Sequence, residues 1–219
     1  MIWPDNKRIA LMVAFDIDAE TMWFRRGMNM PHGIDCTKHM VAMSCGLYST
    51  KQALPRIMKM LDDEDIKATF FTPAYIAELH PDTIKALADA GHEIAYHGYQ
   101  HEVYDTYEKQ DANMTKSERI LEEITGKKTE YMRPPYGAWK KEMEENTGMI
   151  AVLWNVDPLD WNTDNETEIV NKVVTETEEN DIILLHDCYL SSVKAALRII
   201  DIMQAKGYEF VTVDELLLD

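Results

Sequence analysis

Two aspartates and two histidines stand at spacings that suit a metal site. Asp16 and Asp18 are two residues apart, so in an extended chain their carboxylates point to the same side. His97 and His101 are four residues apart, a spacing that puts both imidazoles on one face of a helical turn. Two histidines and one aspartate bind a divalent cation and leave positions open for water and substrate. The alternatives are helix or loop capping by one of the aspartates and a solvated or core histidine pair.

Further polar residues follow apolar runs and add acid–base chemistry. Arg133 stands beside two prolines as a rigid guanidinium suited to hold a carboxylate through two hydrogen bonds, the alternative being a surface salt bridge. His186 follows the apolar run 182–185, and its ordinary pKa of about 6.5 permits proton transfer near neutral pH, the alternative being a core histidine whose hydrogen bonds are satisfied. Asp160 or Asp157 could orient this imidazole and raise its pKa. These residues predict a general acid and base beside a cation.

The elements that must position these residues alternate along the chain. Apolar runs rich in β-formers occur at residues 9–15, 68–72, 93–96, 130–132, 150–154, 182–185 and 208–212. Helical spacing of apolar residues lies between them, for example over residues 54–61. Alternating strands and helices predict a parallel sheet, and seven units favour a closed or nearly closed barrel. A doubly wound open sheet is the alternative, although its Gly-rich phosphate motif is absent after the first strand.

The polar residues fall where the predicted strands end. Active sites of parallel α/β barrels lie at the C-terminal ends of the strands. Five of the seven runs are followed by ionisable side chains, at 16–20, 97–101, 133–137, 155–161 and 186–187. This arrangement predicts one shared site on one rim. The segment 17–50 lies between the first strand and the first clear helix, and we expect a long loop there that packs on the surface or overhangs the site.

Composition narrows the class of protein. The chain has 219 residues, and 46% of them are hydrophobic, which is the content of a folded chain. The length suits a single domain spanning 1–219. The formal net charge of −17 disfavours nucleic acid and anionic membranes as partners. The longest apolar run, 9–15, is too short to cross a bilayer. The first residues lack a signal-peptide pattern, so we expect a cytoplasmic protein.

The ordered motifs resemble those of the polysaccharide deacetylases, also called the NodB-homology or carbohydrate esterase family 4 domain. The resemblance runs from about Ile9 to the C-terminus. Its motifs are Ala-Phe-Asp-Ile-Asp at 14–18, His-x-x-x-His at 97–101, Arg-Pro-Pro-Tyr at 133–136, Asp-Trp at 160–161 and Leu-x-His at 184–186. The resemblance implies an α/β fold, a distorted (β/α)7 barrel. It also implies a hydrolase that removes acetyl groups from N- or O-acetylated carbohydrates such as chito-, peptidoglycan- or xylo-oligosaccharides.

The resemblance implies a metal centre with a base beside it. By match, Asp18, His97 and His101 are the metal ligands. Asp16 is the catalytic base, and Arg133 orients it. The implied cofactor is one divalent ion, zinc first, while cobalt, nickel and manganese are compatible with the same donors.

The remaining matched residues are implied in leaving-group and substrate roles. His186 is the general acid, and Asp160 supports it. The backbone N–H of Tyr136 helps to hold the oxyanion, while Trp161 and Leu184 line the substrate pocket. The expected partner is an acetylated oligosaccharide or a small amide substrate. The sequence does not predict an oligomeric state.

The chain departs from the family pattern in two places, which keeps other functions open. Ile17 separates two aspartates that are usually adjacent, no Gly-Pro follows them, and Gly98 stands where many members have Ser or Thr. These features resemble a branch that includes peptidoglycan deacetylase-like and allantoinase- or cyclic-imide-hydrolase-like enzymes. Hydrolysis of small cyclic amides or imides is therefore the alternative activity, and the missing signal peptide favours it. A carbohydrate-binding protein without catalysis is disfavoured, because each matched catalytic position holds the right side-chain type.

Overall fold

Seven short parallel strands form the centre of the computed structural model, which describes residues 10–19, 21, 40–102 and 107–217. The strands are β1 (Ala10–Asp16), β2 (Thr69–Thr72), β3 (Glu93–Tyr96), β4 (Tyr131–Met132), β5 (Ile150–Ala151), β6 (Ile182–His186) and β7 (Glu209–Phe210). Their order is β5-β4-β3-β2-β1-β6, and β7 pairs with the first residues of β1. All seven predicted strands are confirmed, although β5 ends three residues earlier than the apolar run 150–154 suggested.

The sheet curls until its two ends meet. β5 and β6 stand at opposite ends of the strand order, but the chain that follows β5 returns to β6. Val156 forms a parallel bridge with Ile183, and the Leu184 N–H donates to the Val156 carbonyl over 3.0 Å. Irregular chain therefore completes the wall where a regular strand would stand. The expected distorted (β/α)7 barrel is confirmed, and the open doubly wound sheet is wrong.

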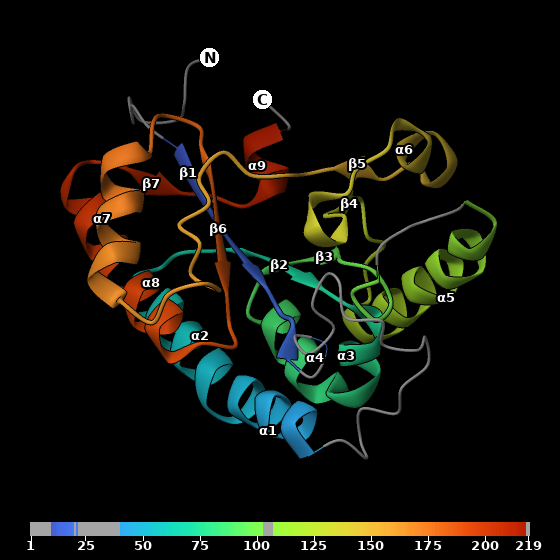
Figure 1. Cartoon of the computed structure of the whole chain (residues 1–219). Helices are drawn as coiled ribbons and strands as arrows, with labels where there is room; N and C mark the ends of the chain where they lie inside the picture. Colours follow the sequence, from blue (N-terminus) through green and yellow to red (C-terminus); the bar gives the residue numbers. More distant parts are fainter. Residues whose placement is uncertain (1–9, 20, 22–39, 103–106, 218–219) are drawn as a thin grey trace.

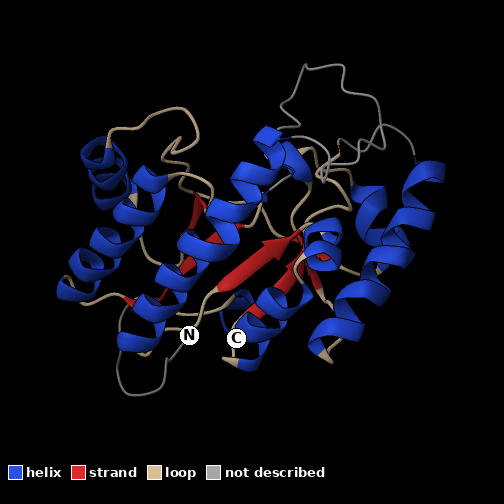
Figure 2. Cartoon of the chain, turned by 90° about the horizontal axis from the view of Figure 1, so that it is seen from below, coloured by secondary structure: helices blue, strands red, loops and turns tan. Residues whose placement is uncertain are grey.

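Helices surround the strands, as Figures 1 and 2 show. They are α1 (Met40–Tyr48), the π-helical turn η4 (Ser49–Ala53), α2 (Leu54–Asp63), α3 (Ala74–Leu79), α4 (Pro81–Asp89), α5 (Tyr107–Thr125), the 3-10 turn η5 (Pro135–Gly137), α6 (Lys141–Thr147), α7 (Glu166–Glu176), α8 (Leu190–Ala205) and α9 (Val213–Leu217). α7 packs on α8, α8 on α2, and both α3 and α4 on α5. Within the described ranges, every helix is too short or too polar to span a bilayer.

The expected loop at 17–50 is wrong over its last third. α1 begins at Met40 and continues through η4 into α2, so the helical chain starts ahead of the amphipathic pattern. α1 consists of apolar and small residues with Met43 and Leu47 exposed, and it therefore lacks the polar stripe from which a helix is recognised. The part of the prediction that concerns residues 20 and 22–39 lies outside the described residues.

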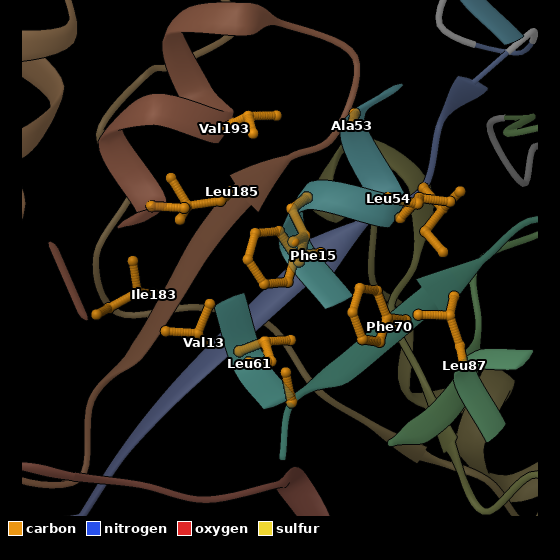
Figure 3. Close-up of a cluster of buried hydrophobic side chains, with 14 of the residues drawn as sticks. Val13, Phe15, Ala53, Leu54, Leu61, Phe70, Leu87, Ile183, Leu185 and Val193 are labelled. Atoms are coloured by element: carbon orange, nitrogen blue, oxygen red, sulfur yellow. The ribbon is translucent and has the colours of Figure 1, made fainter. Parts of the chain in front are cut away.

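Alternate residues of each strand belong to two different cores. One set faces the helices. Leu61 of α2 packs among side chains of three strands, namely Val13 and Phe15 of β1, Phe70 of β2 and Leu185 of β6 (Figure 3). Phe15 and Phe70 stack with their ring centroids 5.4 Å apart. This alternation follows from the two-residue period of a strand.

The other set fills the inside of the barrel with a smaller apolar cluster. Its buried members are Ala14, Phe71, Ala95, Tyr131, Val152 and Val213. Val213 opens α9, and its N–H donates to the Thr69 hydroxyl over 2.9 Å at the start of β2. α9 therefore closes the N-terminal end of the barrel. The inward-facing positions that follow at the opposite end of the strands are polar.

We predict that the helix-facing core supplies much of the stability. Leu61→Ala should lower the free energy of unfolding by about 2–5 kcal/mol, because the fully buried side chain leaves a cavity against the sheet. Leu190→Ala is the matched control, since Leu190 is 46% exposed and surface changes cost about 0.5 kcal/mol or less. Urea unfolding of both variants measures the difference. Equal losses would contradict this assignment of the core.

Candidate active site

The inward strand positions bring the predicted residues together at the C-terminal rim. Asp16 and His186 are register partners at the ends of β1 and β6, which run side by side in Figure 1. His97 follows β3 and Arg133 follows β4, and the Arg133 N–H donates to the Tyr96 carbonyl over 2.8 Å. On each strand, the residue that points to the inside of the barrel just before each of these side chains is apolar. The barrel thus changes from apolar to charged near its C-terminal end.

Asp18, His97 and His101 form a group that fits a metal ion. One potential ligand atom from each lies within 4.8 Å of the others. Asp18 Oδ1 is 3.9 Å from His97 Nε2 and 3.7 Å from His101 Nε2. Of the atoms that face one another here, Asp18 Oδ1 and His97 Nε2 are buried without a hydrogen-bond partner in the described part of the chain. Buried polar atoms without partners are rare and costly, so this donor set suits a cation.

The protonation of the two histidines suits the same role. His97 Nδ1 lies 2.6 Å from the Arg133 carbonyl oxygen, which can only accept, so the ring proton sits on Nδ1. This hydrogen bond leaves the lone pair of Nε2 free for a metal. Burial lowers the pKa of both His97 and His101 to about 4, so the rings are neutral at neutral pH. Burial raises the pKa of Asp18, and a bound cation would favour its ionised form.

The predicted helical turn at the histidine pair is wrong. Residues 97–101 form a tight loop in which Gly98 has φ +82° and His101 has φ +57°, both in the left-handed region. The Gly98 carbonyl accepts from the N–H of Ala74 over 3.0 Å, so α3 uses a group that a helix would have bonded internally. A Cβ at Gly98 would lie 3.1 Å from Pro135 Cγ. Crowding and positive φ together explain why glycine stands here.

Arg133 holds Asp16 with one hydrogen bond instead of the expected two. Its Nη1 lies 2.7 Å from Asp16 Oδ1, while Nε and Nη2 donate to the carbonyls of Val152 and Leu153 over 3.2 and 3.1 Å. The guanidinium also lies 3.9 Å from the centroid of the Phe71 ring. The irregular chain after β5 supplies the carbonyls, which explains why the second carboxylate bond is not made. The prolines keep the arginine rigid but do not determine its partners.

Asp16 is ionised and directed at the metal group. Burial alone would raise the pKa of Asp16, but the positive charge and hydrogen bond of Arg133 contribute to a net lowering of that pKa. Its second oxygen, Oδ2, lies 3.3 Å from His97 Nε2. One carboxylate oxygen is therefore held by the arginine, and the other faces the potential ligands.

His186 is held by Asp160 and not by Asp157. The carboxylate of Asp160 lies 2.7 Å from His186 Nδ1 and accepts the backbone N–H of His186 over 2.8 Å. Burial would lower the pKa of His186, but the charge and hydrogen bond of Asp160, together with the charges of Asp18 and Asp16, raise that pKa to about 10. Asp157 accepts the N–H of Leu159 over 2.8 Å and orders its own loop. The open choice between the two aspartates is settled by these contacts.

The three predicted substrate residues occupy different environments. Tyr136 lies in η5 with φ +60°, and its ring meets the His101 ring edge-on at 4.5 Å. Trp161 follows Asp160 directly and is 47% exposed, so its ring is available to a ligand. Leu184 is buried in register with Ala14, one inward position below His186.

Two polar residues at the site have no signal in the spacing of motifs. Asp187 follows His186 in the sequence and is fully buried. Its Oδ2 accepts a hydrogen bond from the Ser49 hydroxyl in η4. Asp187 lies in the polar strand end 186–187, but no motif spacing gives it a role. Ser49 stands in no motif, and only the tertiary structure brings it to this place.

Comparison with known proteins places these features in a family. The polysaccharide deacetylase family model matches residues 38–151. PdaC of Bacillus subtilis (strain 168), named a peptidoglycan-N-acetylmuramic acid deacetylase, is 32% identical over 151 residues, or 68% of this chain and 32% of that protein. PgdA of Listeria monocytogenes serotype 1/2a (strain 10403S), named a peptidoglycan-N-acetylglucosamine deacetylase, is 28% identical over 182 residues, or 82% of this chain and 39% of that protein.

A solved structure extends the similarity to the whole fold. The structure of the peptidoglycan deacetylase PdaC from Bacillus subtilis superposes with a TM-score of 0.77 and 26% identity, covering 97% of this chain and 91% of that one. The chain spans less than half the length of the two curated relatives. The family match covers more than half of the chain. The chain belongs to the polysaccharide deacetylase family.

Proposed function

We propose that this chain is a metal-dependent hydrolase that removes acetyl groups from acetylated carbohydrates. The observation that carries the proposal is the convergence of three potential metal ligands with ionised Asp16 and cationic His186. Neighbouring acid and base groups whose pKa values are pushed apart are typical of hydrolytic sites. The names of the relatives support an N-acetylated amino sugar as the substrate, and they favour deacetylation over hydrolysis of cyclic imides.

Asp18, His97 and His101 would hold the cation, and we propose zinc. Two neutral imidazoles and a carboxylate are a common ligand set for catalytic zinc, and they leave room for other molecules at the ion. The cation supplies Lewis acidity, which makes a water molecule more acidic and a carbonyl more electrophilic.

The residues of the chain provide the proton transfers. Asp16 Oδ2 takes the proton of the attacking water, while Arg133 keeps Oδ1 in place. The backbone N–H of Tyr136 donates to the oxygen that becomes negative when the acetyl carbonyl is attacked. His186 then gives its proton to the leaving amine, and Asp160 stabilises the imidazolium before that step. Acetate and the free amino sugar are the products, and no covalent enzyme intermediate is formed.

The direct test measures acetate release. Purified protein, stripped of metal and then loaded with zinc, is incubated with chito-oligosaccharides, acetylated xylo-oligosaccharides and a small cyclic imide. We expect zinc-dependent acetate release from the chito-oligosaccharides. Imide turnover without acetate from any sugar would overturn the proposal.

The division of roles between the aspartates gives a second prediction. Asp18→Ala and His97→Ala should lose bound zinc and activity together, whereas Asp16→Asn should keep zinc and lose about 10²–10⁴-fold in kcat. Elemental analysis and initial rates measure the two properties. His80→Ala, a histidine between α3 and α4, is the control and should change neither. Wild-type turnover in Asp16→Asn would show that Asp16 is not the base.

The acid gives a prediction about pH. Asp160, with smaller contributions from the charges of Asp18 and Asp16, raises the pKa of His186 to about 10, so the protonated acid is lost only as pH rises past that value. Asp160→Asn removes the charge, so the pKa of His186 should fall and the alkaline limb of kcat/KM should move to lower pH. Asp157→Asn makes the same change in the same loop and should leave the limb in place. An unmoved limb in Asp160→Asn would remove His186 from the acid role.

A further inference from the structure

A buried carboxylate without a part in the proposed proton transfers lies beside the loop that carries Asp18. Asp187 is fully buried, and its Oδ2 accepts a hydrogen bond from the Ser49 hydroxyl. The backbone N–H of Ala19 faces the same carboxylate, where it partly offsets the burial that raises the pKa of Asp187. The Asp187 N–H in turn points to the Asp16 carbonyl at 3.4 Å. One residue therefore contacts the chain on both sides of Ile17.

These contacts clamp a single peptide unit at the metal group. The Asp18 carbonyl accepts from both the N–H and the hydroxyl of Thr21, over 2.6 and 2.7 Å. The N–H of the same peptide unit is that of Ala19, which faces Asp187. Ala19 has φ +38°, a conformation that a residue with a Cβ keeps only when its surroundings impose it. The peptide unit that follows Asp18 is thus held at its carbonyl by Thr21 and faces Asp187 with its N–H.

Ser49 ties this clamp to another part of the fold. It is the first residue of the π-helical turn η4, it is fully buried, and it comes from the helical layer outside the barrel. π-helical turns are uncommon and recur at functional sites. The Ser49 hydroxyl reaches across 138 positions of sequence to Asp187. It fixes the carboxylate in the orientation that meets the Ala19 N–H.

We infer that Ser49 and Asp187 are positioning residues for the metal ligand Asp18. Ser49 orients Asp187, Asp187 holds the Ala19 N–H, and the Asp18 carboxylate is kept directed at His97 and His101. The inference rests on the proposed function, because it assumes that Asp18 binds a cation. Such outer residues influence affinity for the ion without touching it.

The test compares zinc affinity among single variants by competition with a chelator. Ser49→Ala should weaken zinc binding about tenfold and Asp187→Ala about 10–100-fold, the range found when supports of metal ligands are removed. Asp187→Asn should stay close to wild type, because Asp187 Oδ1 has no partner among the described residues and an amide NH₂ can occupy its place. Ser192→Ala is the matched control. Ser192 is also a buried serine, but its hydroxyl, unlike that of Ser49, has no hydrogen-bond partner among the described residues.

The outcomes separate this inference from the proposed function. Zinc affinity is measured well below the unfolding temperature of each metal-free variant, so a loss of stability alone does not change it. Ser49→Ala and Asp187→Ala variants that bind zinc as tightly as wild type would overturn the inference alone. Wild-type protein that binds no zinc would overturn the proposed function and the inference with it. If Asp187→Ala does not fold, Ser49→Ala, which removes one buried oxygen, decides the question.

Discussion

The buried ion pair between Arg133 and Asp16 is the constraint on which the rest of the site depends. A charged group inside a protein is tolerated only when partners replace its hydration. Arg133 meets this requirement with one carboxylate, two carbonyls and the face of Phe71. These partners come from β1, β2 and the chain after β5. The hydrogen bonds and ring contact of one guanidinium therefore connect three segments of the barrel. Arg133 also orients one oxygen of Asp16 and leaves the other directed at the potential metal ligands.

The same burial moves the pKa values of neighbouring groups in opposite directions. Burial favours the neutral form of each, and it prevails at His97, whose pKa falls to about 4. At Asp16 the charge of Arg133 helps to reverse the effect of burial, and at His186 the charge of Asp160 does so. A neutral imidazole at His97, an ionised carboxylate at Asp16 and a protonated imidazole at His186 therefore coexist in one site. Their different states come from their immediate partners and not from residue type.

The loops at the strand ends contain strained backbone beside most of these groups. Ala19, His101, Tyr136 and Leu159 all have positive φ without being glycine. Each is itself a predicted site residue or stands next to one in the chain or in its loop. Such conformations cost about 1–3 kcal/mol each and persist where the surrounding structure imposes them. The two hydrogen bonds of Thr21 to the Asp18 carbonyl show how the fold imposes such a conformation at Ala19.

The sequence alone determined the barrel units and the polar strand ends, because the two-residue and 3.6-residue periods are local properties. Asp16, Asp18, His97, Arg133 and His186 could be predicted from their place after apolar runs. The loop geometry of the histidine pair, the choice of Asp160 over Asp157 and the single Arg133–Asp16 bond were decided only by tertiary structure. The same is true of Ser49, whose partner Asp187 lies 138 positions away. Closing the barrel selects such partners across the chain, and local spacing carries no record of which groups that closure brings together.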